Sequence, residues 1–196
     1  APAAGRLAAR VKAAYDRVAT LAADYENVQH RGRKRFTARG HVSFGRPRKV
    51  RFEFTDSTDP LVAGSTFVWL GGPTLTGRKA VGPLVYKRAV PLAERPNLRG
   101  YTYDQMDFHA IVTAFLAGAP EARWLGTSPV GGRPLELVEY PSALRGVRIE
   151  RVGIDPALDL PAYRELRETA DGPAVYEAHF RNVRVNGPLP ADTFDP

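Results

Sequence analysis

The sequence predicts an α+β fold, in which strands of an antiparallel sheet follow each of two amphipathic helices. Three observations predict it. In two places apolar residues recur at spacings of three and four, as in helices that dock on one side. Elsewhere apolar and polar residues alternate with period two, as in strands with one buried and one hydrated face. Turn residues then separate the later strands at short intervals, which favours an antiparallel meander.

The first predicted element is an amphipathic helix from about Gly5 to Ala23. Charged residues lie off its apolar stripe, so one side is expected to be docked and the other exposed. The stripe consists of Leu7, Val11, Tyr15, Val18 and Leu21.

Strict alternation predicts the first strands. Strand candidates cover 42–44, 50–54 and 61–70, and Phe67 and Trp69 share one face of the last. The apolar positions suit either a packed core or the wall of a ligand pocket, and the pattern leaves both interpretations open. These positions are Val42, Phe44, Val50, Phe52, Phe54, Phe67 and Trp69.

The stretch from Gly71 to Gly100 is rich in glycine and proline. We interpret it as a long excursion over one end of the sheet, with a single short strand over 85–90. A second helix follows, because Thr102 and Gln105 have the spacing of a capping box. Its apolar positions at helical spacing are Phe108, Ile111, Val112, Phe115 and Leu116, and Gly118 and Pro120 end it. The later strand candidates are 123–125, 135–140, 147–154, 163–169 and 175–185.

Length and composition limit the classes of protein. We expect one domain over residues 1–196, because 196 residues with 43% hydrophobic and 25% charged residues suit a single folded unit. No apolar run approaches the roughly 18 residues that span a bilayer. The chain has no cysteine, which excludes disulfides, thiolate catalysis and cysteine-bound metals.

Positive charge is concentrated near the start of the chain. The net charge is +7, and the basic residues are densest from Arg31 to Arg51. Such a segment attracts anionic lipid, nucleic acid or an acidic protein, or it simply keeps one face hydrated. Both interpretations stay open.

No constellation of catalytic residues is visible. The serines lie outside any Gly-x-Ser-x-Gly elbow, and no phosphate-binding glycine loop occurs. Asp104, Asp107 and His109 are the nearest approach to a metal cluster, but acidic residues are favoured in the first turns of a helix. We therefore expect no enzymatic activity, no catalytic residues, no metal and no cofactor.

Three stretches together resemble the outer-membrane lipoprotein carrier family, the LolA/LolB-like lipoprotein-sorting proteins. They are 40–54, with an Arg-Pro turn between two aromatic strands; 154–161, a turn between late strands; and 180–194, a closing strand with a following turn. The resemblance covers about 5–194. It implies an unclosed antiparallel β half-barrel with amphipathic helices covering its concave face, forming a single LolA/LolB-like lipid- or lipoprotein-binding domain.

The resemblance also implies a function. Such carriers are non-catalytic periplasmic proteins that bind acyl chains of lipoproteins or lipids in a hydrophobic cavity and hand them to the outer membrane. The expected cavity residues are Val42, Phe44, Val50, Phe52, Phe54, Phe67, Trp69, Phe108, Val112 and Phe115. Arg46 matches the family's arginine that bonds lid carbonyls as a latch, although a turn arginine before a proline fits equally.

Partners and location follow as expectations. The partners are lipoprotein acyl chains or lipid, with an anionic membrane surface and a receptor protein as further candidates. The opening Ala1-Pro2-Ala3-Ala4 resembles a chain cut after a removed signal peptide, so we expect the periplasm or cell envelope. One alternative is an envelope sensor or regulatory module that contacts a signalling protein. Another is a nucleic-acid binder using Arg31 to Arg51, which no recognised motif supports, and we expect no nucleic-acid partner.

Overall fold

The chain folds into two compact units, described here from a computed structural model that covers residues 2–94, 96–97 and 99–195. The first unit combines the segment up to Arg17 with Phe108–Phe180. The second unit combines Val18–Asp107 with the segment from Arg181 onward.

The first unit packs two helices on a sheet. Helices α1 and α3 lie against each other and against β10, and they also contact β7 and β8 respectively. Phe108, Ile111, Val112 and Phe115 form the buried face of α3. The elements are α1 (Pro2–Asp16), α3 (Phe108–Gly118), η2 (Ala119–Glu121), β7 (Arg123–Val130), β8 (Arg133–Pro141), β9 (Ile149–Asp155), β10 (Leu160–Arg167) and β11 (Ala174–Val185).

The second unit is mostly sheet. Its longest hairpin pairs two strands from Thr20↔Gly45 to Arg31↔Lys34, and side chains along the first of them alternate between buried and partly exposed. The elements are β1 (Thr20–Arg31), β2 (Lys34–Gly45), β3 (Lys49–Ser57), β4 (Ser65–Trp69), β5 (Thr74–Val81), β6 (Leu84–Pro91), η1 (Leu92–Glu94) and α2 (Tyr103–Met106).

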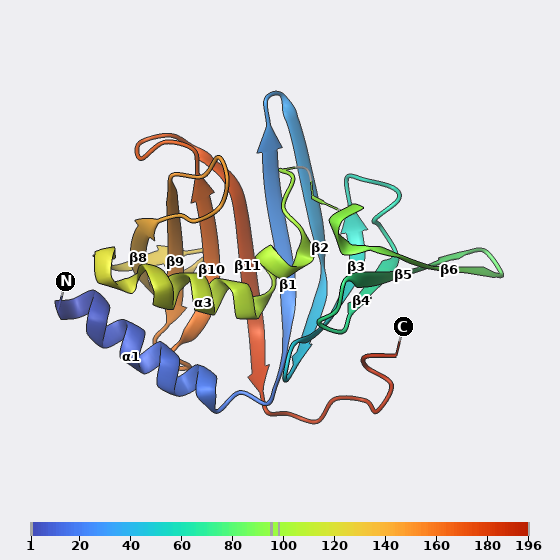
Figure 1. Ribbon diagram of the computed structural model, residues 1–196, viewed down its shortest axis with the longest axis horizontal. Coiled ribbons are helices and arrows are strands. Elements are labelled where there is room, and N and C mark those ends of the chain that lie inside the picture. Colours follow the sequence, from blue (N-terminus) through green and yellow to red (C-terminus); the bar gives the residue numbers. More distant parts are fainter. Residues whose placement is uncertain (1, 95, 98, 196) are drawn as a thin grey trace. The chain divides into compact units, whose positions relative to one another are not determined.

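The strands form one antiparallel sheet of eleven strands in the order β6-β5-β4-β3-β2-β1-β11-β10-β9-β8-β7 (Figure 1). The sheet is open, because β6 and β7 are its two edges. Strand β11 belongs to the first unit up to Phe180 and to the second unit after it. The predicted α+β class with an unclosed antiparallel sheet is confirmed.

Two expectations about the elements are wrong. The first helix ends at Asp16, and the residues from Thr20 onward form β1. The Ala-rich start of β1 has good helix propensity, but twelve residues of β1 pair with β2, and this ladder overrides the local preference. The second error concerns the Gly/Pro-rich stretch. The strand expected over 85–90 is confirmed as β6, but it pairs in a regular hairpin with β5, which was not expected. Gly82, at a φ of 58°, and Pro83 form its two-residue turn between Val81 and Leu84.

The mid-chain helix was predicted correctly at its start but contains a break. Thr102 and Gln105 form the capping box of α2, and the backbone N–H of Thr102 donates to Gln105 Oε1 at 3.1 Å. Asp107 is extended, with a ψ of 169°, and separates α2 from α3. Among the described helices, none combines the length and apolar character needed to cross a membrane.

Candidate functional site

The second unit carries an apolar sheet face built from cross-strand rows. Val42 pairs with Phe52, and Phe52 pairs with Phe67. Gly77 is the next partner in this row, where an added Cβ would lie 3.1 Å from the Phe67 ring. A glycine is therefore needed to let that ring lie flat across β5.

A second row runs beside the first. It joins Phe44, Val50, Trp69 and Leu75 on β2, β3, β4 and β5, and all four side chains are buried. Seven of the ten expected cavity residues thus share one face of the second unit. Burial of this kind is common to a packed core and to the wall of a ligand pocket.

Aromatic rings concentrate where α2 lies on this face. Tyr103 of α2 lies with its ring centroid 5.4 Å from that of Phe52 and 5.7 Å from that of Phe67. Tyr25 on β1 contacts Phe52 edge-on at 5.2 Å, and Phe54 stacks on Phe52 at 5.9 Å. We call these five residues the aromatic cluster. Because the contacts of Tyr103 are with these rings, α2 covers the cluster.

An arginine holds α2 in this position. Arg48 Nε donates to Asp107 Oδ2 at 3.0 Å, and Nη2 of the same guanidinium donates to the backbone carbonyl of Asp104. The Asp107 side chain is fully buried, and the guanidinium also lies over the Trp69 ring at 4.9 Å. Arg48 was not among the expected site residues, because its acidic partners Asp104 and Asp107 fit helix capping in the sequence.

Arg46, the expected latch, makes a different contact. Its Nε donates to the backbone carbonyl of Val18 at 2.6 Å, in the connection before β1. The peptide bond between Arg46 and Pro47 is cis. Arg46 therefore bonds a backbone carbonyl of the connection before β1, and its role as a latch stays a prediction.

A ladder of polar side chains follows the aromatic cluster along the buried face of β1. Asn27 Nδ2 donates to Tyr25 Oη at 3.0 Å, and Gln29 Nε2 donates to Asn27 Oδ1 at 3.2 Å. Asn27 and Gln29 are 4% and 3% exposed, yet Gln29 Oε1 has no hydrogen-bond partner among the residues that the structure describes. An unpaired buried acceptor costs about 1–3 kcal/mol, so this ladder ends in a position where a donor would be favourable.

The other three expected cavity residues belong to the first unit. Phe108 contacts Phe180 edge-on, Phe115 lies against Tyr140, and Val112 is fully buried between them on α3. They form part of the packed core of that unit. The structure therefore divides the expected cavity set between the two units.

The core of the first unit also contains a buried ion pair. Arg164 Nη2 lies 2.8 Å from Glu150 Oε2, and both side chains are 1% exposed. The Tyr140 hydroxyl donates to Glu150, and burial raises the pKa of Tyr140 well above its usual value. Arg164 occupies a buried position of β10. In the sequence, the sign of this ion pair is a charged residue that interrupts the apolar pattern of the strand.

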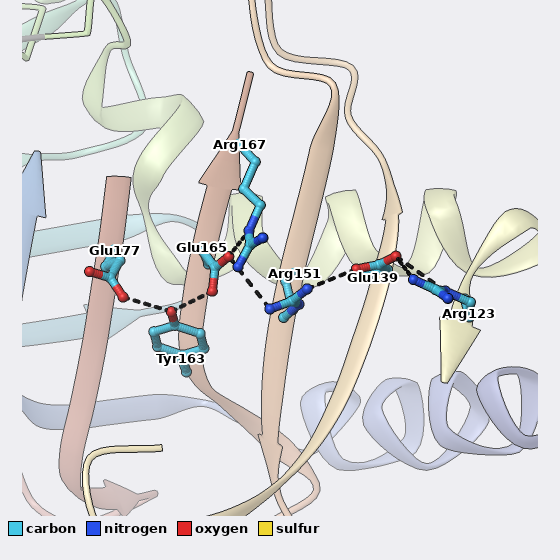
Figure 2. A network of polar contacts seen from close by, with 7 residues as sticks. All are labelled: Arg123, Glu139, Arg151, Tyr163, Glu165, Arg167 and Glu177. Atoms are coloured by element: carbon cyan, nitrogen blue, oxygen red, sulfur yellow. Dashed lines mark hydrogen bonds and ion pairs between the residues drawn. The ribbon is translucent and has the colours of Figure 1, made fainter. Parts of the chain in front are cut away.

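A row of alternating charges crosses the other face of the first unit (Figure 2). Cross-strand pairing places Arg123 opposite Glu139, Glu139 opposite Arg151, and Arg151 opposite Glu165. Arg151 Nη2 lies 3.0 Å from Glu139 Oε2 and its Nη1 lies 3.6 Å from Glu165 Oε1. Figure 2 shows each charge facing a charge of opposite sign, so the row reinforces the sheet.

The row ends at a tyrosine between two carboxylates. The Tyr163 hydroxyl lies 2.7 Å from Glu165 Oε2 and 2.9 Å from Glu177 Oε1, as Figure 2 shows. Burial and these two carboxylates raise the pKa of Tyr163 far above its usual value, so the phenol stays protonated.

The suspected metal ligands are separated by their contacts. Asp107 pairs with Arg48 in the second unit, whereas His109 Nδ1 lies 2.6 Å from the Tyr15 hydroxyl in the first. Across residues 2–94, 96–97 and 99–195, no group of three His, Asp or Glu side chains is arranged to hold a metal ion.

The basic segment has two parts. The turn between β1 and β2 exposes Arg31, Arg33, Lys34 and Arg35. Further along, Arg39 pairs with Glu26, Arg48 with Asp107, and Arg51 with Glu53. The largest group of adjacent exposed cations in the segment is therefore at the tip of the β1–β2 hairpin, which Figure 1 shows projecting from its unit.

Comparisons with known proteins show the fold. MucB, of which one matched structure is from Pseudomonas aeruginosa, has a TM-score of 0.58 and 16% identity over 100% of this chain, which spans 63% of MucB. A structure of MucB in complex with MucA(peri) also matches, with a TM-score of 0.53 and 16% identity over 98% of this chain and 59% of that chain. The Mycobacterium tuberculosis lipoprotein LppX has a TM-score of 0.56 and 11% identity, over 97% of this chain and 99% of LppX.

A LolA superfamily protein from Nitrosomonas europaea is a weaker match, with a TM-score of 0.45 and 9% identity over 96% of each chain. No family model matches the sequence, and no curated protein matches it either. The resemblance to LolA/LolB-like proteins is confirmed as a likeness of fold.

Proposed function

We propose that the chain is a non-catalytic binder of acyl chains in the cell envelope, and that the aromatic cluster of the second unit is where the acyl chain binds. The observation that carries the proposal is the combination of this cluster with the unpaired Gln29 Oε1 beside it. Rings and aliphatic side chains suit methylene groups, each worth about 0.8 kcal/mol when buried. The polar ladder suits the polar end of a lipid, and its unpaired acceptor suits a hydroxyl or an amide N–H.

The closed arrangement implies a lid. An acyl chain that reaches Phe52 and Phe67 takes the place of Tyr103, so α2 moves when the ligand binds. Arg48 holds α2 through Asp107 in the empty state, and cargo offsets that interaction. The expected wall residues Val42, Phe44, Val50, Phe54 and Trp69 then line or support the site. Phe108, Val112 and Phe115 support the first unit.

Delivery of lipoproteins to the outer membrane, with a periplasmic location, is the specific form of this function that the resemblance favours. The likeness in fold to the lipoprotein LppX supports a role that involves lipid. A receptor protein that accepts the cargo is part of the same proposal.

The test is binding of a fluorescent fatty-acid probe to the purified chain. Phe67→Glu places a charge in the cluster at a side chain that is only partly buried, so the fold is expected to survive. Trp124→Glu is the matched control, because Trp124 is an exposed aromatic of the first unit. The proposal requires that the native chain and Trp124→Glu bind the probe and that Phe67→Glu binds it at least tenfold more weakly, about 1.4 kcal/mol. No binding by the native chain would reject it.

The second candidate function is a regulatory module that binds a signalling protein. The match to MucB in complex with MucA(peri) favours it, although this chain spans only 59% of that MucB chain. Co-purification of a periplasmic protein segment with the native chain, in the absence of bound lipid by native mass spectrometry, would favour this candidate.

A further inference from the structure

The end of the β5–β6 hairpin exposes an unusual concentration of apolar side chains. Val81, Leu84, Val85 and Tyr86 are each 54–58% exposed. They are four of the seven large apolar side chains that are exposed in the described part of the chain. No charged residue occurs from Ala80 to Tyr86. Scattered exposed apolar residues need no explanation, but a contiguous group at one projecting tip does.

The apolar side chains cover both faces of the tip. Val81 pairs with Leu84 and Ala80 pairs with Val85, and successive residues of a strand point to opposite faces. A surface that docks on a folded protein needs only one apolar face. A tip that is apolar on both faces suits immersion in a medium that is apolar on all sides.

Positive charges form a collar directly behind the tip. Arg78 lies opposite Lys87, and Lys79 and Arg88 adjoin this pair. Like charges placed directly opposite each other destabilise a hairpin. Within the described residues, Arg78, Lys87 and Arg88 have no carboxylate at ion-pair distance, while Lys79 donates to the Pro60 carbonyl. The collar therefore lacks the anion that would compensate it.

The spacing of tip and collar matches a lipid interface. At about 3.3 Å per residue, the three steps along the strand from Leu84 to Lys87 span about 10 Å, the depth that interfacial elements reach below the headgroups. Tyr86 lies between them, and tyrosine favours the boundary between headgroups and acyl chains. Figure 1 shows the hairpin extending away from the rest of its unit, so its end is free to enter a membrane.

We propose that the β5–β6 hairpin is a membrane anchor, which inserts the tip from Val81 to Tyr86 into the surface of an anionic bilayer while the collar binds its phosphates. The base of the same hairpin is fixed, because Leu75 is fully buried beside Trp69. Because the base of the hairpin is fixed in the sheet, insertion of its tip would also fix the orientation of the sheet relative to the bilayer. The inference does not depend on the acyl site.

The chain has no cysteine, so a single introduced cysteine can be labelled selectively to test the anchor. An environment-sensitive dye is attached through Leu84→Cys, and through Leu70→Cys as the matched control, since Leu70 is 53% exposed but directly follows the end of β4. Each labelled chain is mixed with phosphatidylcholine vesicles that contain phosphatidylglycerol and brominated acyl chains. We expect a blue shift and bromine quenching for the label at position 84 and neither for the label at position 70.

Substitutions separate the two parts of the anchor. Leu84→Asp with Val85→Asp is expected to lower partitioning into the anionic vesicles about tenfold or more, because two apolar side chains no longer enter the bilayer. Arg78→Gln with Lys87→Gln and Arg88→Gln is expected to remove the preference for anionic over neutral vesicles. Leu70→Asp is expected to partition like the native chain, and circular dichroism checks that all variants are folded.

Two results would overturn the anchor. One is a label at position 84 that stays unquenched although the chain sediments with the vesicles, and the other is unchanged partitioning of Leu84→Asp with Val85→Asp. Either would indicate a protein-docking tip instead. Fatty-acid probe binding without vesicles is expected to be the same for these variants and the native chain, so failure of the anchor and failure of the acyl site give different results.

Discussion

Arg48 and Asp107 join the end of one strand hairpin to the helical turn that covers the aromatic cluster. The guanidinium lies at the start of β3 and is about one-third exposed, whereas the carboxylate is fully buried. Removing one partner of a buried pair leaves an uncompensated charge, which is far more costly than the pair itself is stabilising. The position of α2 is therefore sensitive to this one interaction.

Arg48→Leu is expected to raise the affinity for an acyl probe about tenfold, because the closed empty state loses charge-assisted hydrogen bonds worth about 1.5–3 kcal/mol each. An equilibrium titration measures the dissociation constant of the probe, and stopped flow measures its dissociation rate. Arg48→Lys keeps the charge but not the fork that reaches two acceptors, so an intermediate affinity is expected.

Arg46→Leu provides the comparison with the latch that the resemblance implies. If Arg46 is the latch, Arg46→Leu rather than Arg48→Leu raises affinity and slows release. If both variants and the native chain release the probe at one rate, neither arginine controls the lid.

The polar ladder gives a second prediction, in which stability and binding change in opposite directions. Asn27→Leu with Gln29→Leu removes the unpaired Gln29 acceptor together with the Asn27 amide beside it. The free energy of unfolding is therefore expected to rise by about 1–2 kcal/mol. The same variant is expected to lose the preference for a lipid with a free hydroxyl, such as a monoacylglycerol, over a fatty-acid methyl ester. Competition against the fluorescent probe measures this preference. An unchanged preference would remove the ladder from the site.

The strands that were predicted correctly are those whose alternation is both strong and uninterrupted. Phe52 and Phe54 could be placed on one face from the sequence because charged or polar residues separate them from their neighbours. The start of β1 could not, since the alanines at 22 and 23 satisfy a helical and an extended pattern equally well, and only pairing with β2 decides between them.

The candidate site was harder to predict for a physical reason. Alternation identifies a buried face but says nothing about which covering element meets it, so Tyr103 and Arg48 were missed while Phe108 and Phe115 were included. Strand β6 was predicted, over 85–90, whereas its partner β5 was missed because Gly77 and the adjacent charges Arg78 and Lys79 break the alternation that signals a strand. In both places the missing information lies in contacts between distant segments.

Gly118 gives a prediction about packing in the first unit. A Cβ at this position would lie 2.4 Å from the Tyr140 ring, so Gly118→Ala is expected to destabilise the protein by about 1–3 kcal/mol. Gly5→Ala is the matched control, because Gly5 also lies in a helix and an added Cβ meets nothing within 4 Å. That variant is expected to be slightly more stable, since alanine favours helix. Urea unfolding of both variants tests the difference.

Glu139 gives a prediction about acid stability. Arg123 and Arg151 lower the pKa of Glu139 below its ordinary value of 4.5, against the opposing effect of burial. A carboxyl with a lowered folded-state pKa stabilises the protein above its unfolded pKa, and this stability is lost as pH falls through the folded pKa. The free energy of unfolding is therefore expected to fall less between about pH 7 and about pH 3 in Glu139→Gln than in the native chain. Glu121→Gln, at an exposed position, serves as the control and should follow the native chain.

The last prediction concerns the basic tip of the β1–β2 hairpin. Its four cations are exposed and closely spaced, so they attract an anionic membrane at long range without entering it. Arg33→Gln with Arg35→Gln is expected to weaken sedimentation with phosphatidylglycerol vesicles at low salt, by about 1 kcal/mol per cation, and to have no effect at high salt. Bromine quenching at position 84 of the vesicle-bound chain should persist, because insertion depends on the other hairpin. If the double variant binds as the native chain does at low salt, this tip is only a hydrated turn and the attraction comes from the collar behind Tyr86.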